Sequence, residues 1–218
     1  MSTKARVAIL ASGRGSNAQA LLDACAHADF PARVAVVVSN VPEAGVLARA
    51  EAAGVPAVVI PSRGRSREAF EDALLACIGP GGTHTADLVC LAGFMRVLTS
   101  KVVDALRGRI LNVHPSLLPS FPGAHGIRDT LASGVTQAGA TVHLVDDGVD
   151  TGPILAQGTV PVLDDDTETT LAARVLTLEH RLYPMALRWL AEGRVSVEGR
   201  RATVALEPGQ ARWLIGSG

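Results

Sequence analysis

Short apolar runs alternate with helix-spaced segments along the first half of this chain. The run Arg33–Ser39 is almost entirely valine, which is typical of a strand that is buried on both faces. The segment before it places Leu21, Leu22 and Cys25 on one helical face. Such a β-α-β-α order predicts an α/β fold, with a doubly wound, mostly parallel sheet and right-handed crossovers.

The same patterns predict the individual elements of the first half. Strands are expected at Arg6–Leu10, Arg33–Ser39, Ala57–Ile60, Asp87–Ala92 and Ile110–Val113. Helices are expected at Ala18–Ala28, Glu43–Ala53, Ser66–Ile78, where Ser66 is the expected N-cap, and Ser100–Leu106.

The second half has a different pattern, and we expect an antiparallel extension there. Two longer strands, a long helix capped by Thr167 and a terminal hairpin are predicted at Gln137–Val145, Ile154–Val162, Thr167–Glu192, Val195–Glu198 and Arg201–Leu206. Pro184 is expected to kink the long helix or to lie near a break in it. The end of the chain, from Pro208, is expected to be loose. With no repeat and no linker, residues 1–218 are expected to form one domain.

Composition excludes several classes of protein. The net charge of −1 and an aromatic content of 3% argue against nucleic acid as the main partner. The N-terminal apolar run is too short for a signal peptide, and no segment approaches a membrane span. Cys25, Cys77 and Cys90 lie in apolar settings without CxxC spacing, which is typical of buried thiols in a reducing compartment. We therefore expect a cytoplasmic protein.

Three polar residues of the second half suit acyl transfer. Asn112 and His114 are two apart in the strand Ile110–Val113 and at its end, so their side chains should project side by side at the mouth of the sheet. Asp150 ends an acidic loop. An amide, an imidazole and a carboxylate can supply an oxyanion donor, a proton shuttle and a group that orients the imidazole. A polar strand end with no catalytic task is the alternative.

A glycine-rich turn, Gly13–Asn17, follows the first expected strand and opens a helix. Backbone N–H groups there and the helix dipole would suit an anion. A dinucleotide fold would place an acidic residue at the end of the second strand, but Ser39-Asn40 stand there. A P-loop is excluded because no Gly-Lys-Ser/Thr follows. A tight turn without a ligand is the open alternative.

Two further groups are ambiguous. Metal binding would need three ligands from His114, His125, His143 and Asp150, none of which has the short helical spacing of a zinc site, so we expect no metal. The run Leu91–Leu98 could pack in the core or form a hydrophobic wall for a flat ligand.

Five segments, which span nearly the whole chain, resemble one enzyme family. They are VAILASGRGSN, LAGFMRVL, RILNVHPSLLPSFPG, GATVHLVDDGVDTGPILAQ and ARVLTLEHRLYP. NVHPSLLP followed by a DxGxDTGPI loop is specific to formyl-folate enzymes, and the GSN and LEH segments select the ribonucleotide enzyme among them. The chain thus resembles the phosphoribosylglycinamide formyltransferases, folate-dependent enzymes of purine synthesis with a Rossmann-like formyltransferase fold.

The resemblance implies a function for each half of the domain. Residues 5–114 would bind nucleotide or phosphate, residues 115–206 would bind folate and substrate, and residues 207–218 would be a tail. The implied reaction moves the formyl group of 10-formyltetrahydrofolate, a co-substrate, to the amine of glycinamide ribonucleotide. No membrane partner is implied, and the protein would be a monomer or a homodimer.

The resemblance also implies the site residues. The implied catalytic residues are Asn112, His114 and Asp150. The implied substrate-binding residues are Gly15, Ser16, Asn17, Leu176, Thr177, Leu178 and Glu179. The implied folate-binding residues are Arg67, Met95, Arg96, Val97, Leu98, Asn112, Asp146, Asp147, Gly148, Val149 and Asp150.

Some features depart from relatives or leave alternatives. Ser120 replaces a basic residue and Gly126 a polar one, which leaves open which loop groups assist the phosphate. The segments 146–150 and Pro115–Ile127 are expected to move on binding. The rival formyl-folate enzymes should carry more chain: methionyl-tRNA formyltransferase a basic C-terminal domain, and formyltetrahydrofolate hydrolase an N-terminal regulatory domain. A different amine acceptor and a non-catalytic folate- or nucleotide-binding protein are further alternatives.

Overall fold

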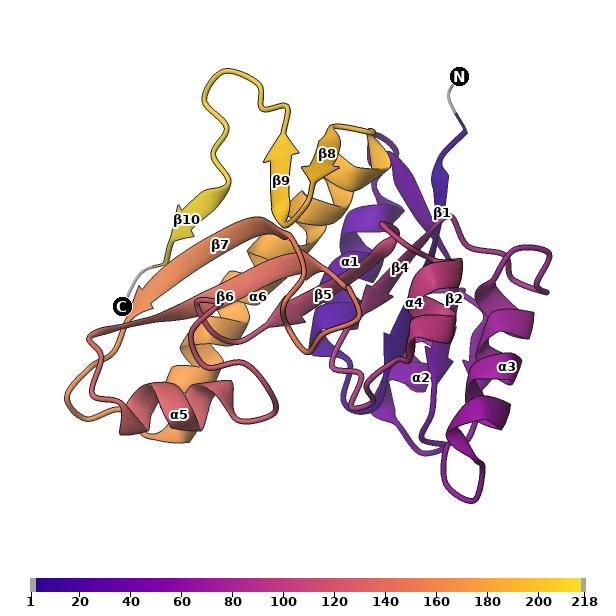
Figure 1. Cartoon of the computed structure of the whole chain (residues 1–218), viewed down its shortest axis with the longest axis horizontal. Helices are drawn as coiled ribbons and strands as arrows, with labels where there is room; N and C mark the ends of the chain where they lie inside the picture. Colours follow the sequence, from indigo (N-terminus) through magenta and orange to yellow (C-terminus); the bar gives the residue numbers. More distant parts are fainter. Residues whose placement is uncertain (1–2, 217–218) are drawn as a thin grey trace. The chain divides into compact units, whose positions relative to one another are not determined.

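A computed structural model describes residues 3–216 of the chain (Figure 1). The chain divides into two compact units, Met1–Leu111 and Asn112–Gly218, and the division falls inside one strand. Each unit has its own sheet strands and its own buried side chains.

The first unit is built of parallel strands that alternate with helices. Its strand order is β4-β1-β2-β3, and every pairing among these four strands is parallel. The strands and helices, in chain order, are β1 Ala5–Ala11, α1 Ser16–Ala26, β2 Ala32–Ser39, α2 Gly45–Ala52, β3 Ala57–Val59, α3 Arg67–Ile78, β4 Leu88–Leu91 and α4 Ser100–Ala105. The predicted doubly wound sheet is confirmed for this unit.

The order of strands in this unit reverses at β1. The chain proceeds from β1 through β2 to β3 on one side and then returns to β4 on the other side of β1. Helices α1 and α2 pack together on β2, while α3 packs with α4. Open α/β sheets bind ligands outside the carboxyl ends of strands at such a reversal, and β1 ends there at Ala11, directly before the glycine-rich turn.

The second unit begins with the last residues of β5 (Ile110–His114) and is largely antiparallel. Its strand order is β5-β6-β7-β10, with β6 (Gln137–Leu144) antiparallel to β7 (Ile154–Pro161). Helix α6 (Glu168–Ala191) packs on β6 and β7. The hairpin of β8 (Val195–Glu198) and β9 (Arg201–Val204) is a separate antiparallel pair, so the antiparallel extension is confirmed.

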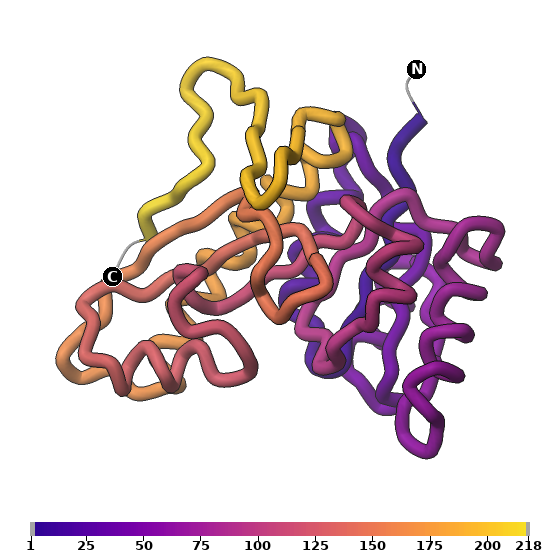
Figure 2. The backbone as a smooth tube through the Cα atoms, in the orientation of Figure 1, coloured from indigo at the N-terminus to yellow at the C-terminus, as the bar shows by residue number. Residues whose placement is uncertain are grey.

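Two elements of the second unit differ from expectation. No helix was predicted between residues 115 and 136, but α5 (Gly126–Ala132) forms there and packs on α6. After β9 the chain makes a long excursion and returns beside β7 as β10 (Trp213–Ile215), as Figure 2 shows. The expectation of a loose end is therefore wrong for β10, while residues 217–218 of that tail lie outside the described residues.

Both predicted helix caps are confirmed. The Ala69 N–H donates to Ser66 Oγ at 3.1 Å, and the Thr170 N–H donates to Thr167 Oγ1 at 3.2 Å. Pro184 lies inside α6, which continues for 24 residues without a break. The helix is held at this point by the core, because Tyr183 and Leu187 on either side of the proline are fully buried.

Candidate active site

The glycine-rich turn of the first unit is shaped by close packing on α2. Gly15 precedes α1 with φ of 76°, and a Cβ atom there would lie 2.6 Å from the side chain of Val46. The Val46 N–H donates to Gly13 O at 3.1 Å. Only glycine fits this position, directly before the first turn of α1, which contains Ser16 and Asn17.

Arg49 of α2 binds the same turn through its guanidinium group. Its Nε donates to Arg14 O at 2.8 Å, and its Nη1 donates to Gln19 Oε1 at 3.1 Å. Gln19 in turn donates to Asp23 Oδ1 at 2.8 Å. The turn is thus tied to both helices that flank it, although nothing in the spacing of Arg49 suggested this role.

The predicted ligand wall, Met95–Leu98, is half open to solvent. Met95 is 76% exposed and Val97 is 54% exposed, whereas Leu98 is buried. Arg96 turns toward α3, where its guanidinium lies 4.8 Å from the ring centroid of Phe70. Met95 and Val97 are therefore not core side chains. Their exposure favours the other interpretation of this run, a hydrophobic surface for a ligand.

Hydrogen bonds to Ser12 and Glu71 hold this wall at both ends. Ser12 Oγ accepts from the Met95 N–H at 2.8 Å, and it donates to Asn40 Oδ1. Glu71, only 2% exposed, accepts from the Thr99 N–H at 2.8 Å and from the Thr99 hydroxyl. Arg67 is the first residue of α3 and is exposed, one turn before Phe70. Glu71 was not predicted as a site residue. The only indication of its role in the sequence is that an acidic residue lies on the buried face of a helix.

Asn112, His114 and Asp150 meet in the second unit. The Asn112 amide nitrogen donates to Asp150 Oδ1 at 3.4 Å, and His114 Nδ1 lies 3.4 Å from Asp150 Oδ2. The side chains of His114 and Asp150 are 6% and 12% exposed. The period of two along β5 therefore brings both side chains to one carboxylate, as expected.

His143 is a fourth member of this cluster. Its Nε2 lies 3.2 Å from the Asn112 amide nitrogen and 3.6 Å from Asp150 Oδ1, while its Nδ1 lies 2.9 Å from Leu144 O. Because the carbonyl can only accept, Nδ1 donates to it, while Nε2 faces both the Asn112 amide and Asp150 Oδ1. The β6–β7 register shifts at His143, an irregularity that commonly redirects a side chain toward a site.

The backbone after β5 fixes the other side of His114. Its Nε2 donates to Phe121 O at 2.9 Å, and Phe121 has a positive φ of 54°. A Cβ atom at Gly126 would lie 3.3 Å from this same nitrogen. Both ring nitrogens of His114 thus face acceptors, Phe121 O and Asp150 Oδ2.

The environment of Asp150 favours its ionised form. Burial alone would raise its pKa, but the contact with His143, the Gly123 N–H at 2.8 Å and the neighbouring His114 lower the pKa below its ordinary value. Asp150 has a positive φ of 55°, a costly conformation for a residue other than glycine. A Cβ atom at Gly152 would lie 1.8 Å from Leu144 O, which explains the glycine of the Asp-Thr-Gly sequence.

The rest of the acidic loop is held by Asp146. Its Oδ1 accepts from the Gly148 N–H at 3.1 Å and from Thr151 Oγ1 at 2.7 Å. Asp147, Gly148 and Val149 are exposed. Of the predicted folate-binding residues in this loop, these three are open to a ligand, whereas Asp146 shapes the loop.

The predicted substrate residues of α6 differ in their exposure. Leu178 is buried, and a Cβ atom at Gly158 of β7 would lie 2.8 Å from it. Thr177 is exposed, with its hydroxyl bonded to Arg174 O at 2.7 Å, and Leu176 is half-buried. Glu179 is 6% exposed. Leu178 therefore packs against the sheet, and Glu179 is a buried carboxylate on the same helix.

Known proteins with similar sequences identify the family of this chain. The formyl transferase family model matches residues 5–187. The chain belongs to the formyl transferase family. It is 48% identical over 204 residues to a phosphoribosylglycinamide formyltransferase of Mycobacterium tuberculosis, with 93% of each chain covered.

Solved structures of formyl transferases share its fold. The crystal structure of glycinamide ribonucleotide transformylase 1 from Symbiobacterium toebii has 47% identity and a TM-score of 0.87, covering 92% of this chain and 94% of that one. A formyltetrahydrofolate deformylase from Pseudomonas syringae is 27% identical, with a TM-score of 0.84, and this chain spans 66% of its length. The formyltransferase fold of the chain is thereby shown.

Among residues 3–216, no group of three or more His, Cys, Asp or Glu side chains is arranged to hold a metal ion. None of the helices described is both long and apolar enough to cross a membrane.

Proposed function

We propose that this formyl transferase transfers the formyl group of 10-formyltetrahydrofolate to the amine of glycinamide ribonucleotide, in de novo purine biosynthesis. The products are formylglycinamide ribonucleotide and tetrahydrofolate. The contact of Asn112, His114 and His143 with one buried, ionised carboxylate, Asp150, carries the proposal. The names of the relatives given above support the acceptor and the transferred formyl group.

In this mechanism the substrate amine attacks the formyl carbon, and a tetrahedral oxyanion forms. Asn112 exchanges its long 3.4 Å contact with Asp150 for the oxyanion, a contact that protonated His114 shares. The new C–N bond is kept when the bond to N10 of the folate breaks. His114, or a water that it holds, moves a proton from the attacking amine to the departing N10. Asp150 stabilises the imidazolium by its opposite charge.

The phosphate, the folate and the glycinamide end would be bound by different groups of residues. Gly15, Ser16 and Asn17 cradle the substrate phosphate with backbone N–H groups at the start of α1. Arg67 and Met95–Leu98 form the folate wall, with residues 146–150 as its loop. Leu176–Glu179 holds the glycinamide end through Glu179, the buried carboxylate of the segment.

The proposed setting follows from the chemistry of the chain. We propose a cytoplasmic enzyme, because its three cysteines are buried and none forms a disulfide among the described residues. Its partners are small molecules, and it acts as a monomer or homodimer without a metal. Movement of residues 146–150 and Pro115–Ile127 on binding stays a prediction, which unchanged protease sensitivity with and without ligands would contradict.

The deciding experiment measures formyl transfer from 10-formyltetrahydrofolate to glycinamide ribonucleotide. Wild type is compared with His114→Ala and with a reaction that lacks acceptor. Acceptor-dependent turnover that collapses in His114→Ala is the expected result. Loss of formyl without acceptor would point to a hydrolase instead, and absence of both reactions would leave a binding protein or another amine acceptor.

A further inference from the structure

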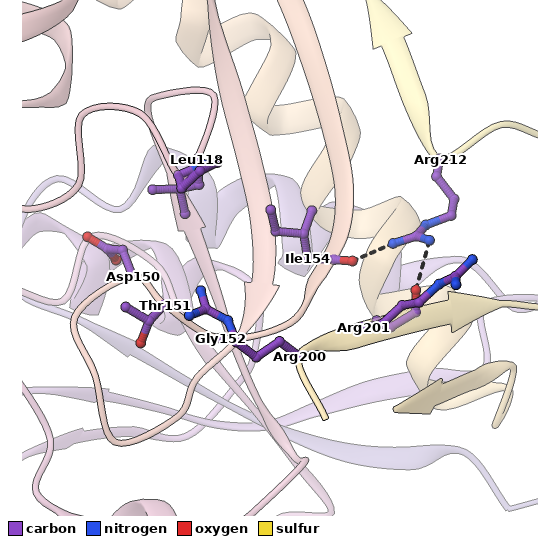
Figure 3. A pocket seen from close by; sticks show the side chains of 10 residues that line it. Leu118, Asp150, Thr151, Gly152, Ile154, Arg200, Arg201 and Arg212 are labelled. Carbon is purple, nitrogen blue, oxygen red and sulfur yellow. Dashed lines mark hydrogen bonds between the residues drawn. The ribbon is translucent and has the colours of Figure 1, made fainter. Parts of the chain in front are cut away.

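A cavity of about 320 Å³ lies in the second unit beside the Asp150 segment (Figure 3). Its lining comes from Leu118-Pro119, Asp150–Gly152, Ile154, Arg200–Ala202 and Arg212. That volume is at the lower end of the roughly 300–1,000 Å³ typical of small-molecule sites. No residue of the proposed phosphate turn or of the folate wall takes part in it.

Three arginines line this cavity, but only one carboxylate does. Arg200 stands in the turn between β8 and β9 and extends toward Thr151, whereas Arg201 and Arg212 lie together (Figure 3). Asp150 does not balance these charges, because its oxygens are engaged by His114, Asn112 and the Gly123 N–H. Within residues 3–216, no carboxylate forms an ion pair with Arg200, Arg201 or Arg212.

Arg212 is held as a fixed part of the wall. Its guanidinium donates to Leu155 O and to Ala202 O, both at 2.8 Å, and to Ile154 O. Carbonyl oxygens orient the cation without neutralising it. Burial, and then the charge of Arg201, lower the pKa of Arg212 below its ordinary value.

We propose that this cavity is a second anion-binding site, for a metabolite-sized phosphate or carboxylate that carries at least two negative charges. Arg200 and Arg201 are the adaptable donors, and guanidinium groups bind both anions in a bidentate manner. Thr151 and Gly152 form the opposite wall, so a bound anion would touch the segment that carries Asp150.

The cavity shares Asp150 with the proposed catalytic cluster, but its arginines belong neither to that cluster nor to the Gly13–Asn17 turn, so anion binding there can be tested separately from formyl transfer. Two sources could supply its ligand: a free phosphorylated metabolite, or the glutamate tail of a folate. Both offer the same chemistry to the arginines. Inorganic phosphate and p-aminobenzoylglutamate are therefore used as separate probes.

The test is a titration followed by amide NMR at constant ionic strength, with chloride as the reference anion. Signals of Thr151, Gly152 and Ala202 report on the cavity, and those of Ser16 and Asn17 report on the turn. The variant is Arg200→Ala/Arg201→Ala, which removes two exposed side chains. Arg128→Ala/Arg181→Ala is the control, because it removes two exposed arginines of the same unit that do not line the cavity.

Saturable shifts at the cavity in wild type and in the control, weakened about tenfold or more in Arg200→Ala/Arg201→Ala, would support the site. The probe that binds more tightly identifies the source. Cavity signals that stay still, follow chloride equally, or respond the same in all three proteins would overturn it. Shifts of Ser16 and Asn17 are independent of this outcome, so a failure of the proposed phosphate turn would be seen separately.

Discussion

Asp150 is the residue that connects both histidines and the amide of the candidate site. It lies within 3.6 Å of His114 and His143 and accepts from Asn112 and the Gly123 N–H. A carboxylate that stays ionised here can hold a charged imidazole without becoming protonated itself. We therefore expect Asp150 to act by its charge and by orienting its neighbours.

Asp150→Asn should lower kcat by about 10²- to 10⁴-fold, the range of general acid–base effects. Asn keeps the size of the side chain but removes the negative charge that lies 3.4 Å from His114 Nδ1. Steady-state rates of formyl transfer measure the loss. Asp129→Asn, on α5 with a side chain 41% exposed, is the matched control. Normal turnover in Asp150→Asn would remove Asp150 from the mechanism.

Arg49 offers a second prediction for a single residue. Arg49→Met removes the charged donor to Arg14 O, a contact of about 1.5–3 kcal/mol, so the KM for glycinamide ribonucleotide should rise about 10- to 100-fold. The KM for the folate should stay unchanged, because the folate wall is held by Ser12 and Glu71.

Arg33→Met is the matched control for Arg49→Met. Both arginines line the same surface groove of about 410 Å³, but Arg33 makes no contact with the turn. Equal changes in both KM values for Arg49→Met would indicate general loosening of the unit rather than a role in phosphate binding.

The side chains that meet in the candidate site could be predicted from the sequence, whereas the backbone groups that contact them could not. The period of two along a strand anticipates the contact of Asn112 and His114 with one partner. Phe121 O and the Gly123 N–H carry no residue type that marks them, since every residue has these groups. Gly126 was noted only as a departure, although it lies against His114.

Among the elements, the two helices with side-chain caps were predicted, whereas α5 and β10 were missed. Ser66 and Thr167 marked two helix starts by their hydroxyls. Helix α5 has no side-chain cap among the described residues and follows a segment rich in proline and glycine. Strand β10 has three residues, two of them exposed, so tertiary pairing rather than pattern decides its structure.

The connection from β7 to α6 is held by Asp166, which bonds to Arg174 of the helix. The hydrogen bonds from Arg174 and the Leu163 N–H hold the pKa of Asp166 well below its ordinary range, against the effect of burial. Its stabilising contribution should therefore be complete above the unfolded-state pKa of about 4, and be lost only as pH falls below that value.

Urea unfolding of wild type and Asp166→Asn at several pH values checks this dependence. The difference in unfolding free energy should be constant from pH 7 to pH 5 and shrink in stronger acid. Asp165→Asn, at an exposed neighbour, should show no such difference. A difference that already disappears between pH 7 and pH 5 would contradict the lowered pKa.

The cysteines and the tryptophans, which can each report unfolding, lie in different units of the molecule. Cys25, Cys77 and Cys90 all belong to the first unit, and the only tryptophans, Trp189 and Trp213, belong to the second. Burial raises the pKa of Cys25 to about 12, so its thiolate is scarce in the folded protein. Thiol labelling therefore reports unfolding of the first unit, and fluorescence that of the second.

We expect the two probes to give the same urea midpoint, because β5 continues unbroken through the boundary between the units. Trp213→Phe removes the exposed tryptophan and leaves buried Trp189 as the reporter. Two separate midpoints would show that the units unfold independently.

Strand β10 also bears on how the protein can be engineered. The Gly216 N–H donates to Thr159 O at 2.7 Å, so pairing with β7 continues to the last described residue. A fusion partner at this end needs a flexible spacer to avoid pulling β10 from the sheet. A version shortened before Trp213 would uncover the edge of β7 at Gln157–Thr159, whose free peptide groups invite intermolecular pairing and precipitation on storage.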